Sequence, residues 1–108
     1  MRTAPTSLVR AVLELLRLRG LVAWQNNTGA VNIGRRYVRF GARGLPDVLA
    51  VLPGGRLLAL EVKTGGGRLT ADQRAARDNL RAAGALVWEV RDLGELDALL
   101  REVLAVTA

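Results

Sequence analysis

The chain has 108 residues, half of them hydrophobic, which is enough for one folded domain with a single core and too few for two. It contains neither cysteine nor histidine, which excludes a disulfide framework, a zinc site built on thiolates or imidazoles, a histidine general base and a cysteine nucleophile. The formal net charge of +6 favours a polyanion as partner, because clustered arginines bind phosphate and attract nucleic acid. Any metal ion must be bound by oxygen atoms, which select hard cations such as Mg²⁺ or Mn²⁺.

The first segment predicts an amphipathic helix over residues 8–19. Its hydrophobic residues recur at helical spacing on one face, and Arg10, Glu14 and Arg17 lie on the other. Glu14 has Arg10 four residues before it, which is typical of a solvated pair, so a structural role is expected for it. Gly20 should end the helix. Charged residues interrupt any apolar run here, so neither a signal peptide nor a membrane span is expected, and the predicted location is cytoplasmic.

A short strand over 21–24 leads into a polar and then a basic segment. Asn26 and Asn27 form either a turn or a substrate contact, and the sequence leaves both open. Alternation over 37–40 suggests a strand inside the basic segment. The arginines there are interleaved with Tyr37 and Phe40, which favours a DNA backbone contact over a merely solvated loop. These arginines are Arg35, Arg36, Arg39 and Arg43.

Two nearly continuous apolar runs, 48–52 and 57–60, flank Pro53-Gly54-Gly55. Strands without polar alternation are covered on both faces, so helices should lie above and below this sheet. A three-residue loop, with a type I turn and a bulge at its last glycine, would place Asp47 opposite Glu61. A two-residue loop would instead send the two carboxylates to opposite faces.

The remaining elements alternate between helix and strand. Thr70 and Gln73 have the spacing of a capping box for a helix that runs to residue 83 and stops at Gly84. A strand follows over 85–90. A second helix, bearing leucines between 96 and 104, should begin after Asp92. The order predicts one α/β domain spanning residues 1–108, with a mixed β-sheet flanked by helices on both faces.

Three residues could carry chemistry at one end of this sheet: Asp47, Glu61 and Lys63. Lys63 is the sole lysine among sixteen basic residues, and it lies two residues beyond Glu61 on the same face of the strand. Carboxylates about 5 Å apart on paired strands repel one another unless a cation lies between them. The Val62 carbonyl is a further oxygen ligand. The alternative is that Asp47 caps a turn while Glu61 and Lys63 form a surface ion pair worth at most about 1 kcal/mol.

Several motifs resemble one known nuclease family when they are taken together: Gly44-Leu45-Pro46-Asp47, Glu61-Val62-Lys63, and Gly67-Arg68-Leu69-Thr70 with Gln73. They resemble the stand-alone, phage-type VRR-NUC family of the PD-(D/E)XK nuclease superfamily. The likeness includes residues 24–29 and covers about residues 13–90. It implies a restriction-endonuclease-like core, Mg²⁺- or Mn²⁺-dependent hydrolysis of DNA phosphodiesters, a homodimer, and a preference for branched DNA such as four-way (Holliday) junctions.

The resemblance also implies roles for individual residues. Asp47, Glu61 and the Val62 carbonyl would hold the metal, and Lys63 would serve the nucleophilic water. It assigns Gln73 an active-site role, whereas the residue pattern alone explains Gln73 equally well as a helix cap.

The chain also departs from this family's pattern. The family's usual glutamate near the start of the first helix is matched here by Pro5-Thr6-Ser7, and Gln25 stands where arginine is common. Two alternatives therefore remain, a non-catalytic DNA-binding module with a nuclease-like fold and a structural or assembly protein.

Overall fold

The computed structural model describes residues 6–26, 29–40, 44–63 and 68–107. These residues form three helices and six strands. In chain order they are α1 (Thr6–Leu18), β1 (Val22–Gln25), β2 (Gly29–Ile33), β3 (Arg36–Phe40), β4 (Val48–Val51), β5 (Leu57–Val62), α2 (Ala71–Ala82), β6 (Leu86–Val90) and α3 (Leu93–Thr107). Within the described parts of the chain there is no helix with the length and apolarity to span a membrane.

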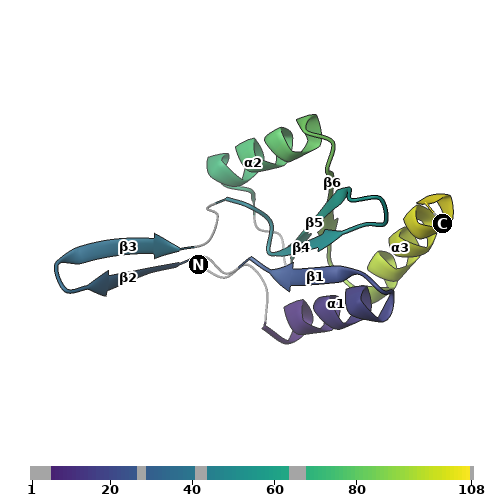
Figure 1. The fold of residues 1–108 in the computed structure, drawn as a ribbon, viewed down its shortest axis with the longest axis horizontal. Coiled ribbons are helices and arrows are strands. Elements are labelled where there is room, and N and C mark those ends of the chain that lie inside the picture. Colours follow the sequence, from purple (N-terminus) through teal and green to yellow (C-terminus); the bar gives the residue numbers. More distant parts are fainter. Residues whose placement is uncertain (1–5, 27–28, 41–43, 64–67, 108) are drawn as a thin grey trace.

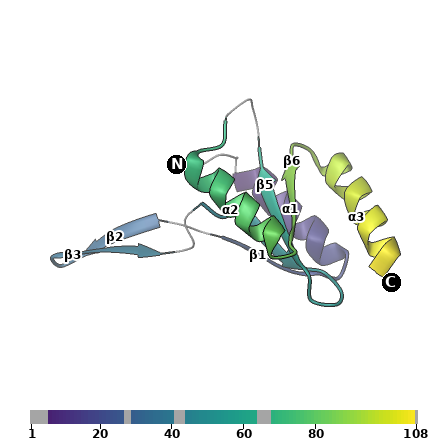
Figure 2. The same ribbon diagram turned by 90° about the horizontal axis from the view of Figure 1, so that it is seen from above.

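Four strands form a mixed sheet in the order β1-β4-β5-β6. The pairs β1·β4 and β4·β5 are antiparallel, while β6 is parallel to β5, because α2 crosses over between them. Helix α2 covers one face of the sheet, and α1 and α3 cover the other (Figures 1 and 2). The predicted α/β class, with a mixed sheet between helices on both faces, is confirmed.

Side chains of β4 and β5 are buried on both faces of the sheet, as their unbroken apolar pattern predicted. Val48, Leu58 and Leu60 are fully buried in the larger cluster, which includes residues of α1 and α3. The alternate residues Leu49 and Ala59 belong to a smaller cluster on the α2 side. The two-fold alternation of a strand thus divides the core between the two helical layers.

The β4–β5 hairpin has the predicted register but a different turn. Val48 pairs with Leu60 and Val51 with Leu57, so one further step places Asp47 opposite Glu61. The predicted type I turn is wrong, because Gly54, the third residue of the turn, has φ +90°. A positive φ at that position characterises a type II turn, which glycine adopts without strain. Both turns enclose three residues, so the correction leaves the register unchanged.

Local capping signals explain where the helices begin and end. Gly20 has φ +81° after α1, and the Leu21 N–H donates to the Leu16 carbonyl at 3.1 Å, which closes the helix in a Schellman-type end. Gly84 acts in the same way after α2. At the start of α3 the Glu95 N–H donates to the Asp92 carboxylate at 2.8 Å. These predicted ends are confirmed.

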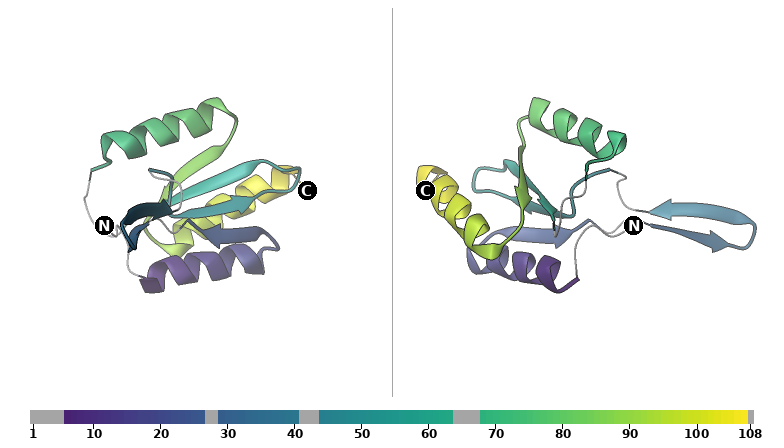
Figure 3. Two further views of the ribbon diagram at one scale, coloured as in Figure 1. Left: turned by 60° about the vertical axis from the view of Figure 1, so that its left-hand side comes forward. Right: turned by 180° about the vertical axis from the view of Figure 1, so that it is seen from behind.

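Strands β2 and β3 form a separate two-stranded hairpin, residues 29–40, which we call the arm. It projects from the helix-covered body (Figures 1 and 3). Ile33 pairs with Arg36 across a two-residue turn, and Gly34 has φ +64°, as the first central position of a type II′ turn requires. The sequence predicted a strand at the β3 position but not β2, so the hairpin itself was missed.

Candidate active site

Two charged residues are buried at one end of the sheet, on the face covered by α2. Glu61 is 2% exposed and Lys63 is 5% exposed, and they are the only buried charged side chains found among the described residues. Glu61 lies in β5 and Lys63 follows that strand directly, while Asp47 immediately precedes the neighbouring strand β4. The alternative of a surface Glu61–Lys63 ion pair is therefore wrong, because the surrounding sheet and helix exclude solvent from both groups.

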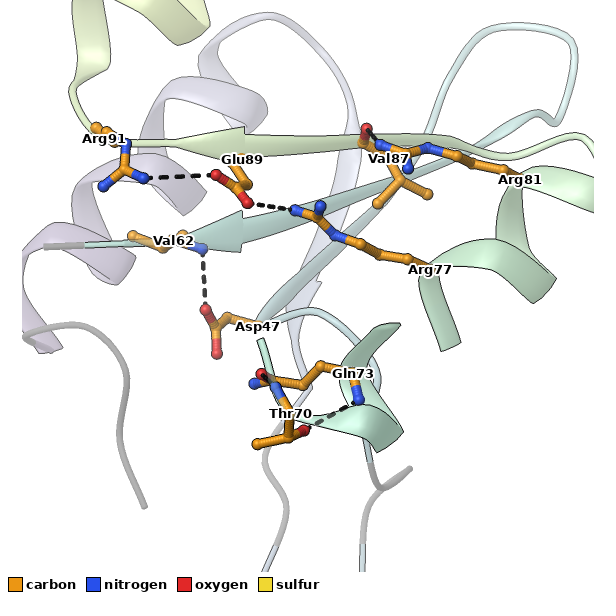
Figure 4. A network of polar contacts seen from close by, with 9 residues as sticks. All are labelled: Asp47, Val62, Thr70, Gln73, Arg77, Arg81, Val87, Glu89 and Arg91. Carbon is orange, nitrogen blue, oxygen red and sulfur yellow. Dashed lines mark hydrogen bonds and ion pairs between the residues drawn. The ribbon is translucent and has the colours of Figure 1, made fainter. Parts of the chain in front are cut away.

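Asp47 is held by hydrogen bonds on both sides. Its carboxylate Oδ2 accepts the Val62 N–H at 2.9 Å (Figure 4). Its backbone carbonyl accepts the Asn26 N–H at 2.8 Å, which continues the β1·β4 ladder by one residue. Since the N–H and C=O of one strand residue point to the same neighbour, the Val62 carbonyl is also directed toward the side of Asp47.

The two carboxyl groups interact strongly. The pKa of Glu61 is raised from 4.5 to about 7, first by burial and then by the negative charge of Asp47. A side-chain hydrogen bond between the two acids raises it further, while the positive charges of Lys63 and Arg77 lower it. A bound cation would relieve the same repulsion that now favours a proton on Glu61.

The donor set fits a hard divalent cation. Two carboxylates and a backbone carbonyl provide only oxygen ligands, the set expected for Mg²⁺ or Mn²⁺. The described part of the chain contains no group of three or more acidic residues that could hold a metal. Water and a phosphate oxygen would have to complete the coordination, as is common for Mg²⁺ sites.

A second set of charges beside the acids was missed from the sequence. Glu89 is the β6 partner of Glu61 in the parallel register. Its carboxylate contacts the Arg77 guanidinium of α2 at 2.9 Å and that of Arg91 at 3.5 Å (Figure 4). Arg77 lies one turn beyond Gln73, and Glu89 shares the face of Val87 on its strand. The helical spacing from Gln73 to Arg77 and the strand alternation from Val87 to Glu89 could have predicted that the two side chains face one another between α2 and the sheet.

The arginine–glutamate pair shapes the electrostatics of the site. The Arg77 side chain is only 13% exposed and its Nε is buried with no hydrogen-bond partner. Its positive charge acts on Glu61 as well as on Glu89. The Glu89 carboxylate is already engaged by Arg77 and Arg91, which disfavours its use as a metal ligand.

Gln73 is fixed in the first turn of α2. Its side-chain Oε1 accepts the Thr70 N–H at 2.9 Å, and its own N–H donates to the Thr70 hydroxyl at 3.1 Å (Figure 4). This is the predicted capping box. The structure therefore shows a capping role for Gln73, whose amide NH₂ takes no part in the capping box.

Of the predicted DNA-binding residues, one lies beside the acids, and the others lie on the arm or outside the described residues. Arg35 and Arg36 are exposed at the tip of the arm, and Arg39 lies in β3, opposite Ala30. Asn26 is adjacent to the site through its bond to Asp47. Asn27 and Arg43 lie outside the described residues. Glu14 is exposed on α1, which packs on the opposite face of the sheet from Glu61, as its expected structural role requires.

Comparison with models of protein families, with characterised proteins and with solved structures finds no match. The geometry of the site and the motifs in the sequence are therefore the guides to function.

Proposed function

We propose that the protein is a Mg²⁺- or Mn²⁺-dependent endodeoxyribonuclease with a restriction-endonuclease-like core of the VRR-NUC type. One observation carries the proposal. Asp47, Glu61 and Lys63 meet at the end of two paired strands, with Glu61 and Lys63 buried and with Glu61 at a raised pKa. A stable domain has little structural reason to bury an acid and an amine beside a second, half-buried acid, since each buried charge must be compensated.

Each of the three residues has a distinct task in phosphodiester hydrolysis. Asp47, Glu61 and the Val62 carbonyl would hold the metal, which supplies Lewis-acid stabilisation of the charged phosphate when it is bound. The bond from the Val62 N–H keeps the Asp47 carboxylate oriented before metal arrives. Lys63 presents its ammonium beside the acids, where it positions the attacking water and neutralises charge that builds on the phosphate.

The remaining features of the proposal concern the substrate and the assembly. The net charge of +6 and the exposed Arg35 and Arg36 support a nucleic-acid substrate. Branched DNA such as a four-way junction, and a homodimer that binds it, follow from the family resemblance. Sedimentation of the chain alone and with junction DNA measures the assembly, and a monomer under both conditions would contradict the homodimer.

DNA cleavage by matched variants tests the proposal. Junction, flap and linear duplex DNA labelled at one end would be incubated with Mg²⁺ or Mn²⁺ and with the protein or its Lys63→Met variant. Methionine fills a similar buried volume without the charge, so the fold should persist while cleavage falls by about 100-fold or more. Circular dichroism and thermal unfolding confirm that the variant is folded. Equal cleavage by both proteins would rule out the mechanism.

A non-catalytic DNA-binding module is the second candidate. It is favoured by the two-carboxylate site, because Glu14 lies on the other side of the sheet and supplies no further acid. Calorimetric titration with Mn²⁺ separates the two candidates. A nuclease should take up Mn²⁺ in a manner abolished by Asp47→Ala, whereas a binding module should show no such uptake.

A further inference from the structure

All of the charged residues in the arm are basic. Its residues 29–40 include Arg35, Arg36 and Arg39 and no acidic residue, and no acid occurs anywhere between Glu14 and Asp47. In the core, by contrast, Arg77 and Glu89 compensate one another. The charge of the arm is therefore directed to a partner outside the body, and that partner should be negatively charged.

The dimensions of the arm select a duplex groove. Each strand has five residues, which extend about 17 Å at the usual rise, and paired strands lie about 4.8 Å apart. The major groove of DNA, about 12 Å wide and 8.5 Å deep, admits such a ribbon with its side chains, whereas the minor groove, about 6 Å wide, would have to be widened by bending the duplex. The tip can thus reach the floor of the groove while the base of the arm stays outside it.

The tip carries cationic and apolar side chains, and both kinds can contact the groove of a duplex. Arg35 and Arg36 are exposed there, and a guanidinium group binds a guanine edge or a phosphate through two parallel hydrogen bonds. Ile33 is 60% exposed and Tyr37 is 65% exposed beside them, although large apolar side chains in an ordinary hairpin pack against a body. Apolar groups at such a tip can pack against thymine methyl groups or sugars.

The base of the arm is adjacent to the candidate active site. The segment before β2 is tied to the site, since the Asn26 N–H donates to the Asp47 carbonyl at 2.8 Å. The segment after β3 leads through Gly44 directly to Asp47. A duplex held by the arm therefore has its backbone near the acids, within about the length of the arm.

We propose that the arm inserts into the major groove of duplex DNA beside the phosphate that the site would cleave. The placement of that phosphate rests on the proposed function, but binding by the arm requires neither metal nor hydrolysis. A second copy of the chain is disfavoured as occupant, because two such arms would bring like charges together. The substrate would accordingly need a stretch of duplex on the side of the arm.

Binding in the absence of metal tests this proposal independently of catalysis. Fluorescence anisotropy would measure binding of a labelled 20-base-pair duplex in EDTA to the protein, to Arg35→Ala/Arg36→Ala, and to the matched control Arg10→Ala/Arg101→Ala. The control removes the same charge from exposed positions on α1 and α3. We expect the arm variant to bind at least about tenfold more weakly and the control less than about threefold.

Methylation protection identifies the groove. Dimethyl sulfate modifies guanine N7 in the major groove and adenine N3 in the minor groove, and the protein should protect N7 only. Protection should disappear with the arm variant and persist with the control Arg10→Ala/Arg101→Ala. Protection of N3 instead, equal weakening by the two double variants, or an arm variant that changes only sedimentation would overturn the proposal. A protein that protects N7 but never cleaves would refute the nuclease function and leave this inference intact.

Discussion

Glu61 gives the site a pH dependence that unfolding experiments can detect. Its pKa is about 7 in the folded protein against an ordinary value of 4.5, so between these pH values the folded state keeps a proton that the unfolded state has lost. The free energy of unfolding should therefore fall as pH rises from 4.5 to 7, by an amount on the order of 3 kcal/mol, and this contribution should level off above 7.

The variant Glu61→Gln isolates this effect from other titrating groups. Urea unfolding of both proteins would be measured in EDTA from pH 4.5 to 8. Glutamine cannot ionise, so the stability of the variant relative to the parent should rise across this window. A difference between the two proteins that stays constant with pH would show that Glu61 titrates normally.

At position 47, asparagine is a more informative substitution than alanine for testing metal binding. In Asp47→Asn the amide oxygen can still accept the Val62 N–H, so the fold should persist, while one charged ligand is lost. We expect Mn²⁺ to raise the melting temperature of the parent and to bind the variant at least about tenfold more weakly. Equal heats of Mn²⁺ binding in calorimetry for the two proteins would exclude Asp47 as a ligand.

The affinity of the parent for Mn²⁺ should also decrease below pH 7, because a proton on Glu61 competes with the metal.

At the scale of single elements, the first turn of α2 lets the two roles of Gln73 be separated. Thr70→Ala and Gln73→Ala each remove half of the capping box, and Thr70→Ala should lower the free energy of unfolding by about 1 kcal/mol. If Gln73 acts as a cap alone, both variants should lose stability and DNA cleavage in similar proportion. Denaturant unfolding and the junction assay would be run side by side. A cleavage loss for Gln73→Ala far beyond that of Thr70→Ala would assign it to the active site.

The elements that the sequence predicted well are those governed by local rules. Loop length alone set the β4–β5 register, and glycine or side-chain caps set the helix ends at Gly20, Gly84 and Asp92. The turn type was mistaken because glycine permits both signs of φ, and the sequence does not decide between them.

The two misses in the prediction have different causes. Strand β2 pairs with β3 across the two-residue turn at Gly34 and Arg35, which is a local hairpin signal, but the polar stretch before β2 obscured it. The Arg77–Glu89 pair depends on how α2 lies over β6, so it required the packed structure. The register that sets Asp47 opposite Glu61 could be predicted because both residues belong to one hairpin.

At the scale of the whole molecule, the body and the arm are joined at a tightly packed point. Gly44 has φ +80°, and a Cβ there would lie 2.9 Å from the Asp72 backbone oxygen of α2. The chain returning from the arm is therefore fixed against the same helix that covers the acids. Gly44→Ala should lower the melting temperature and weaken Mn²⁺ binding, because both the φ angle and the clash involve backbone. Gly34→Ala is the control, since Gly34 has a positive φ but open space around it at the distant tip. Loss of Mn²⁺ affinity in the control as well would contradict this link.

Removal of the arm tests whether the body is an autonomous folding unit. Neither core cluster includes an arm residue among those described, and Gly29 lies opposite Phe40, so a link of two glycines can replace residues 29–40. The shortened chain should unfold within about 1 kcal/mol of the parent, since a shorter loop changes the closure entropy only slightly. It should also retain Mn²⁺ binding and lose duplex affinity at least as far as Arg35→Ala/Arg36→Ala. Thermal unfolding, calorimetry and anisotropy would measure the three properties. A shortened protein that fails to fold would mean that the arm stabilises the body, and its separation from the core would then be incorrect.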